Sequence, residues 1–148
     1  MDEWLKTKIL DVLSRHHVMT VATIRPDGYP QATTVNYVHQ GLTLFFGTDA
    51  ASQKAANIKL NSKISVAIAS ETEDLYKLRG LSMSGTAERV CDPKRVQDLS
   101  LLLFEKLPQA KRLVPEEPKQ LAIFAITPVA ISLVDYACGY GKTFLVEL

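Results

Sequence analysis

The residues with the clearest potential for binding chemistry lie between positions 47 and 54. They supply a glycine, two hydroxyl groups, an amide and an ammonium group, in the order Gly47, Thr48, Ser52, Gln53 and Lys54. The first turn of a helix has unpaired N–H groups and a partial positive charge, so such side chains placed there can hold a phosphate. The stretch therefore predicts an anion site. The competing interpretation is a capped surface helix whose Lys54 extends into water.

The elements that must position these groups are a strand and a helix. Residues 42–47, LTLFFG, alternate as a strand does, and we expect the strand to break at Gly47. Apolar residues then recur at helical spacing from 51 to 58. Thr48 and Asp49 both have side chains suited to cap that helix. The anion site is thus predicted at a strand–turn–helix corner.

Composition excludes several classes of function. The 148 residues are 47% hydrophobic, and this length and composition are typical of one globular domain spanning 1–148. The net charge of +1 gives no general electrostatic attraction to nucleic acid or membranes. No apolar run approaches the roughly 20 residues of a membrane helix. The N-terminus lacks the apolar core of a secretory signal, and Cys91 and Cys138 stand far apart, so we expect a cytoplasmic protein with free thiols.

The remaining chain reads mainly as strands. Asp2 is expected to cap a first helix, whose apolar stripe is Leu5, Ile9, Val12 and Leu13. Asp92 and Pro93 are expected to open a second helix that ends before Pro108. Its apolar stripe is Val96, Leu99, Leu103 and Leu107. Strands are predicted at 18–24, 32–38, 64–68, 81–88, 121–127 and 129–136, besides the one ending at Gly47; the last two are joined or bent at Pro128. The first three strands should form antiparallel hairpins. Pro115 and Pro118 fall in an irregular connector.

Strands in runs with a few separate helices predict an α+β fold with an antiparallel sheet. Six or seven short strands would close most easily into a small barrel, which leaves no exposed edge. Pattern and spacing go no further than this.

The segment LFFGTDAASQKAANI resembles the phosphate-binding segment of the pyridoxamine 5′-phosphate oxidase-like, FMN-binding split β-barrels. Three other segments are similar to the family's first hairpin, fifth strand and terminal strand: VATIRPDGYPQATTVNY, LRGLSMSGTAERV and ISLVDYACGYGKTFLVEL. The resemblance covers most of the chain. It implies a six-stranded antiparallel split β-barrel with peripheral helices, and a homodimer with two FMN sites at the subunit interface.

The resemblance also implies which residues bind the cofactor. Lys54 would bind the FMN phosphate with Thr48 and Ser52. Gln53 stands where the family often has Arg and would donate one bond. The flavin ring would lie along Thr33, Thr34, Val35 and Asn36. Gly47 either lets the backbone approach a ligand or only makes a bend. Gly80 and Leu81 would reach the flavin held chiefly by the other subunit, Gly80 through its backbone alone.

These expectations lead to an FMN-dependent oxidoreductase acting on a small molecule, with no catalytic residue named because a flavin exchanges hydride without one. The Arg- and His-bearing C-terminal segment of true pyridoxamine phosphate oxidases is not found. Two alternatives stay open: a barrel that uses the deazaflavin F420 or haem, and a flavin-binding module without turnover. Metal and P-loop sites are not expected, because His16 and His17 are adjacent and GYGKT lacks the first glycine and a following helix.

Overall fold

The computed structural model describes residues 1–113 and 117–148. In that part of the chain it has three α-helices: α1 (Glu3–Arg15), α2 (Gln53–Leu60) and α3 (Pro93–Lys106). The strands are β1 (Val18–Ile24), β2 (Pro30–Asn36), β3 (Val38–Gln40), β4 (Thr43–Asp49), β5 (Lys63–Ala69), β6 (Arg79–Arg89), β7 (Leu121–Asp135) and β8 (Thr143–Glu147). Short 3₁₀ turns lie at η1 (Leu75–Lys77), η2 (Pro108–Arg112), η3 (Pro118–Gln120) and η4 (Tyr136–Cys138).

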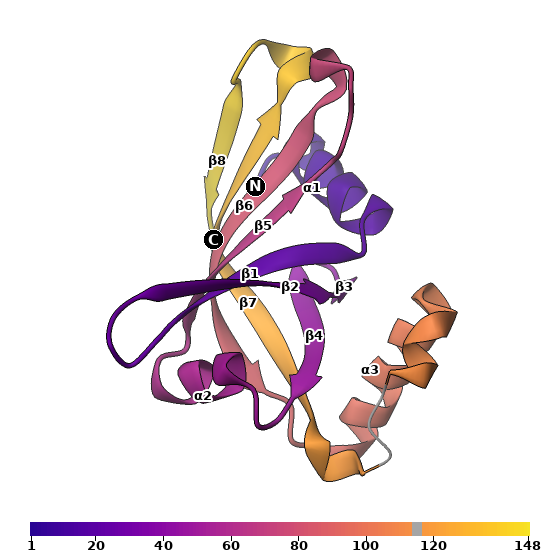
Figure 1. The fold of residues 1–148 in the computed structure, drawn as a ribbon. Helices are drawn as coiled ribbons and strands as arrows, with labels where there is room; N and C mark the ends of the chain where they lie inside the picture. Colours follow the sequence, from indigo (N-terminus) through magenta and orange to yellow (C-terminus); the bar gives the residue numbers. More distant parts are fainter. Residues whose placement is uncertain (114–116) are drawn as a thin grey trace.

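One antiparallel sheet curls into a half-barrel, which confirms the α+β split-barrel prediction (Figure 1). The strand order is β2-β1-β5-β6-β7-β4-β3, with β8 paired to β7. The sheet has eight strands where six were predicted. The two ends of the order, β2 and β3, are separated along the chain only by Tyr37, so the sheet must curl to bring its ends together.

The predicted strand at 32–38 and its hairpin with the next strand are wrong in detail. β2 ends at Asn36, and Val38–Gln40 forms the separate strand β3, which pairs with β4. Between them Tyr37 turns fully inward, and its hydroxyl donates to the Leu13 carbonyl at 2.8 Å. The chain therefore bends here because a buried aromatic residue redirects it from one end of the sheet to the other.

The longest strands, β6 and β7, connect the two halves of the barrel. The two strands predicted to be joined or bent at Pro128 form one continuous strand, β7, with a bulge at this point: Ser84 pairs with Ala130, but Gly85 pairs with Pro128. A Cβ at Gly85 would lie 2.6 Å from the Thr127 carbonyl oxygen, so only glycine fits there. The alternation predicted for 81–88 is confirmed, with Leu81, Met83 and Ala87 buried.

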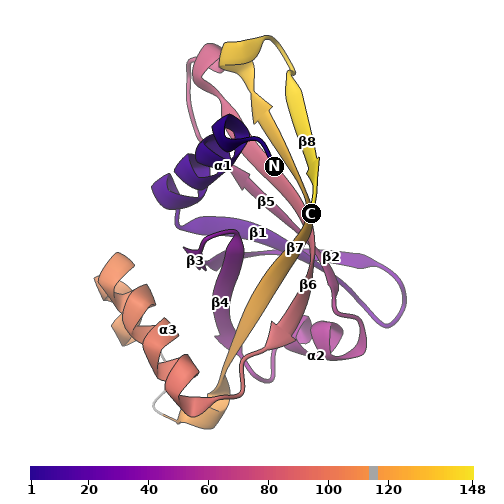
Figure 2. The same ribbon diagram turned by 180° about the vertical axis from the view of Figure 1, so that it is seen from behind.

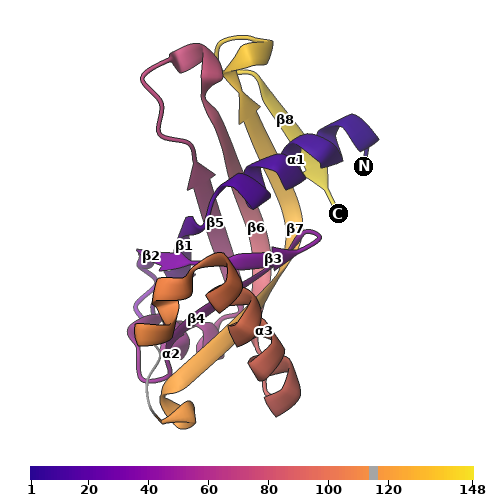
Figure 3. The same ribbon diagram turned by 90° about the vertical axis from the view of Figure 1, so that its right-hand side faces the viewer.

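Two helices cover opposite parts of the sheet. Helix α1 packs against β6 and buries the predicted stripe of Leu5, Ile9, Val12 and Leu13 (Figure 2). Helix α3 lies outside β3 and β4 (Figure 3). It buries only Leu99 fully, so the stripe predicted for α3 is wrong in extent: Val96, Leu103 and Leu107 are half-buried. Pro108 begins η2 and Pro118 begins η3, while Pro115 lies outside the described residues.

The corner between β4 and α2 differs from the prediction in two ways. β4 runs through Gly47 without a break and pairs with β7 as far as Asp49. Ser52, not Thr48 or Asp49, caps α2, because its Oγ accepts the N–H of Ala55 at 3.3 Å. Asp49 instead stabilises the turn before the helix by accepting the N–H of Ala51 at 2.8 Å.

Candidate functional site

The end of β4 and the first turn of α2 bring three of the predicted side chains together. The Thr48 hydroxyl lies 3.3 Å from the Ser52 hydroxyl, and the Lys54 ammonium donates to Thr48 Oγ1 at 3.5 Å. All three residues are half-buried, and we refer to Thr48, Ser52 and Lys54 together as the Lys54 corner. The ammonium thus turns back toward the helix N-terminus, as an anion site requires, rather than extending into water.

Gln53 lies apart from this cluster. Its Nε2 donates to Asn57 Oδ1 at 2.8 Å, one helical turn away on the face of α2 that meets β1 and β2. Asn57 is 0% exposed, and its Nδ2 donates to Thr23 Oγ1 at 3.0 Å and to Gln31 Oε1 at 3.1 Å. This network holds α2 on the β1–β2 hairpin and so fixes the direction of its N-terminus.

The sequence pattern did not identify Asn57, Thr23 or Gln31 as residues that position the site. The available signal was a polar Asn57 between Ala55 and Ile58 on the buried side of the helix, four residues after Gln53. A fully buried amide needs hydrogen-bond partners, so such a residue points to a polar neighbour across the interface.

The predicted residues of β2 divide between its two faces. Val35 is buried in the core, and Thr33 faces the same way, toward the side where Gln31 meets α2. Thr34 and Asn36 are exposed on the opposite face. Thr33 and Val35 therefore share the face of β2 on which Gln31 meets α2, because successive side chains of a strand alternate.

The Thr33 hydroxyl is the one buried side-chain oxygen or nitrogen without a hydrogen-bond partner among the described residues. Such orphaned groups are rare in folded proteins and call for a specific explanation, such as a bound water or ligand. β2 also lies at one end of the strand order, with only β1 paired to it in the described part of the sheet. Its other edge leaves backbone groups available to a ligand.

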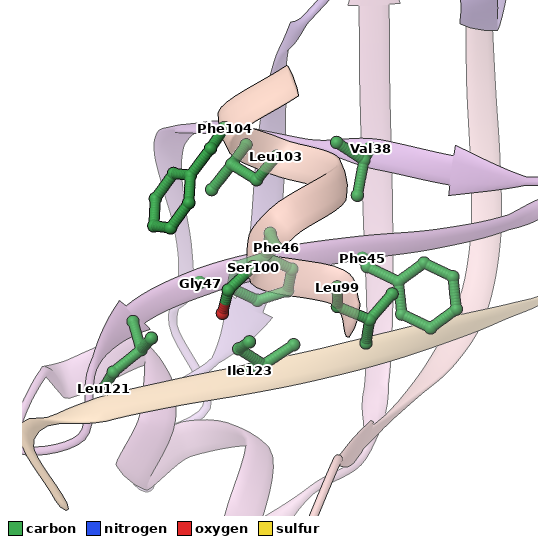
Figure 4. A pocket seen from close by; sticks show the side chains of 10 residues that line it. All are labelled: Val38, Phe45, Phe46, Gly47, Leu99, Ser100, Leu103, Phe104, Leu121 and Ile123. Carbon is green, nitrogen blue, oxygen red and sulfur yellow. The ribbon is translucent and has the colours of Figure 1, made fainter. Parts of the chain in front are cut away.

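Gly47 lies beside an apolar pocket rather than among the polar side chains of the Lys54 corner. The pocket is lined by β4, β7 and α3, including Phe46, Leu99 and Ile123 (Figure 4). A Cβ at Gly47 would meet the side chain of Leu121 at 3.2 Å. The absence of a side chain at Gly47 thus serves packing against Leu121, and the predicted break of the strand at Gly47 is wrong.

Gly80 and Leu81 lie at the end of the sheet remote from α2, where β6 begins beside η1 and η4 (Figure 1). The structure does not bring them to the Lys54 corner of the same chain. The side chain of Leu81 is 4% exposed and belongs to the core. The backbone of this pair is part of the sheet on both sides, with β5 pairing one edge of β6 and β7 the other.

The same end of the molecule holds a network of charges. Arg79 donates to the buried carboxylate of Asp135 at 3.1 Å and to Asp11 on α1 at 3.3 Å. Since Arg79 and Asp135 both begin or end long strands, the pair ties β6 and β7 to α1. We interpret this network as structural.

His16, at the C-terminal end of α1, has a pKa below its usual value. Burial is the largest cause, and the positive charges of His17, Lys106 and Arg15 add to it, against Asp11. The Lys106 ammonium donates to the His16 carbonyl at 2.7 Å and lies 4.6 Å from the centre of the Tyr37 ring. Burial lowers the pKa of Lys106 and raises that of the Tyr37 phenol.

Across residues 1–113 and 117–148 no group of three His, Cys, Asp or Glu side chains is placed to hold a metal ion. In the same ranges, none of the helices has the length and apolar character that crossing a membrane requires. The GYGKT segment leads into β8 instead of a helix, in agreement with its rejection as a P-loop.

The chain is similar in sequence to proteins of one known family. A sequence model of the pyridoxamine 5′-phosphate oxidase family matches residues 5–135. The general stress protein 26 of Bacillus subtilis (strain 168) is 28% identical over 145 residues, which cover 87% of this chain and 96% of that protein.

Two solved structures show the same fold. The general stress protein 26 of Bacillus anthracis str. Sterne has a TM-score of 0.71 and 22% identity, covering 97% of this chain and 98% of its own. A haem-binding protein from Mycobacterium smegmatis has a TM-score of 0.77 and 18% identity, covering 92% of this chain. This chain spans 55% of that protein's length.

Proposed function

Because the chain belongs to the pyridoxamine 5′-phosphate oxidase family, we propose that it binds FMN at the β4–α2 corner and acts as an FMN-dependent oxidoreductase. In this proposal Lys54, Thr48 and Ser52 hold the phosphate, and the backbone of β2 from Thr33 to Asn36 receives the flavin ring along its unpaired edge. Bound FMN would supply the electron transfer, while the protein binds and orients it and excludes water.

The unpaired Thr33 hydroxyl carries this proposal. It is buried, it lies on the same side of β2 as the residue that contacts α2, and no described protein group satisfies it. A ligand group placed between β2 and the Lys54 corner would remove the cost of leaving that hydroxyl unpaired, about 1–3 kcal/mol. The inward turn of the Lys54 ammonium supports the same location.

The proposal includes a homodimer. Within one chain, Gly80 lies at the far end of β6 from α2, so a contact between this end of β6 and a flavin would require a flavin held by a second copy. Light scattering of the purified protein, with and without FMN, tests this arrangement. A monomer that retains FMN would contradict it.

The purified protein should be yellow, with an oxidised-flavin spectrum and with FMN identified by mass after denaturation. Apoprotein titrated with FMN should quench flavin fluorescence and form a one-to-one complex per chain. Failure to bind added FMN would overturn the flavin assignment. Steady oxidation of NADPH or NADH with an added acceptor separates an enzyme from a flavin-binding module without turnover.

A haem-binding barrel is the second candidate. It is favoured by the similarity in fold to the Mycobacterium smegmatis haem-binding protein and by Gln53, which stands where the family often has Arg. Because Gln53 is neutral, the deazaflavin F420 is a further ligand to test. A Soret band on addition of haem, together with no flavin binding, would favour the haem alternative over FMN.

A further inference from the structure

An open polar pocket lies between the β1–β2 turn and the start of α2. It has a volume of about 570 Å³ and is lined by Arg25, Pro26, Asp27, Gln31 and Gln53. The β1–β2 turn extends beyond the sheet on the same side as α2 (Figures 1 and 2). Four of the five lining residues have polar or charged side chains, so the pocket suits a hydrophilic ligand group.

The inner wall of this pocket is fixed from the core. Gln31 and Gln53 each use one amide atom to bond the fully buried Asn57. The second amide atom of each has no protein partner among the described residues, and both side chains line the pocket. Because one amide points its oxygen and the other its nitrogen at Asn57, the pair offers a ligand one donor and one acceptor.

Arg25 supplies the positive charge. Its Nη2 pairs with Asp27 Oδ2 at 2.6 Å, and both side chains are 48% exposed. An exposed ion pair of this kind contributes about 0–1 kcal/mol, so a doubly charged phosphate can compete with Asp27 for the guanidinium. The other guanidinium N–H groups have no acceptor in the described part of the chain.

The position of the pocket connects it to the Lys54 corner. Gln53 directly precedes Lys54 on α2, and Gln31 lies two residues before the unpaired Thr33 on the same face of β2. The Arg25 pocket and the Lys54 corner therefore flank the first turn of α2 from two sides, and a phosphate at the helix N-terminus would lie between them. Gln53 itself is neutral, so any second positive charge at this phosphate comes from a residue outside α2.

We propose that Arg25 and Gln31 form a second anion subsite, in which Arg25 binds phosphate oxygens of the ligand held by Lys54 and the free Nε2 of Gln31 donates to them. Gln53, whose free amide oxygen only accepts, lines the wall of this subsite. The proposal rests on the function proposed above, with Asn57 as the positioning residue of the subsite. It assigns to the β1–β2 turn a part in ligand binding and predicts that Asp27 weakens that binding by competing for Arg25.

The test compares FMN with riboflavin, which lacks the phosphate, by fluorescence titration of the apoprotein. Arg25→Ala should weaken FMN binding about tenfold and leave riboflavin binding within about twofold, since it removes a charge-assisted contact to the phosphate alone. Asp27→Asn should strengthen FMN binding while keeping the acceptor that Asp27 Oδ1 provides for the Tyr29 N–H. The matched control is Lys6→Ala, an exposed cation on α1, which should bind FMN as the wild type does.

A second measurement tests the subsite without flavin. Inorganic phosphate should raise the melting temperature of the wild type above that in NaCl of equal ionic strength, and this increase should be smaller for Arg25→Ala. Equal FMN affinity in wild type and Arg25→Ala overturns the subsite while FMN binding itself stands. If the wild type binds no FMN, the proposed function fails, and the absence of a phosphate-specific increase would overturn the subsite as well.

Discussion

The Lys54 ammonium lies 3.5 Å from the Thr48 hydroxyl, so the side chain folds over the start of its own helix. Lys54→Ala should therefore weaken FMN binding by roughly 1.5–3 kcal/mol, the range for a charge-assisted hydrogen bond. Titration of apoprotein with FMN measures this. Lys59→Ala, which removes an exposed lysine from the last turn of the same helix, is the control. Unchanged affinity in Lys54→Ala would remove the phosphate assignment.

Thr33→Val should separate ligand binding from stability. The hydroxyl has no partner among the described residues, so replacing it by a methyl group should leave the free energy of unfolding of the apoprotein unchanged or raise it by up to about 1 kcal/mol. FMN affinity should fall by about 0.5–1.5 kcal/mol. Urea unfolding and FMN titration measure the two quantities, with the exposed Thr34→Val as control. A large loss of apoprotein stability would show that the hydroxyl is paired within the protein.

Asn57→Leu should destabilise the fold by about 2–3 kcal/mol. The change leaves the buried Thr23 hydroxyl and the Gln31 amide without their partner on α2. Urea unfolding measures the loss. Gln53→Ala removes only the exposed end of the network and should cost less than about 1 kcal/mol. Equal losses in the two variants would contradict a network that depends on Asn57.

Gly85→Ala should destabilise by about 1–3 kcal/mol, because its Cβ would lie 2.6 Å from a backbone oxygen of β7. The backbone has little room to yield, since β6 and β7 are paired on both sides of the bulge. Thermal unfolding compared with Ser84→Ala, the exposed neighbour on the same strand, measures the effect. A melting temperature equal to that of the control would refute the steric argument.

Stability should fall on acidification because of His16. Its pKa is lower in the folded chain than the unfolded value of about 6.5, so the unfolded state binds more protons between these two values. Stability is thus lost as the pH falls below about 6.5 and levels off below the folded pKa. His16→Asn should show a smaller drop in melting temperature between about pH 7 and 5. An NMR titration of the imidazole checks the direction of the shift, and an identical drop in the variant would contradict it.

Much of the local structure follows from the sequence alone. The stripe of α1 and the alternation of β5 and β6 are visible as periodic burial, because a helix or strand with one face on the core must repeat at its own period. The segment from 42 to 58 also identified the family. Helical and strand periodicity and a local motif depend only on residues close together in the chain, so they can be recognised in the sequence.

The tertiary structure decided what depends on distant residues. Alternation in β2 separates Thr33 from Thr34, but only the packing of β2 against α2 shows that Thr33 faces inward and lacks a partner. Thr48, Asp49 and Ser52 are all able to cap a helix, and the pairing of β4 with β7 through Asp49 left Ser52 to do so. Likewise Asn57 bonds Thr23 and Gln31, and Arg25 shares a pocket with Gln53, because α2 rests on a hairpin more than 20 residues earlier in the chain. Side-chain type limits what each residue is able to bind, and the curl of the sheet selects which of those partners it meets.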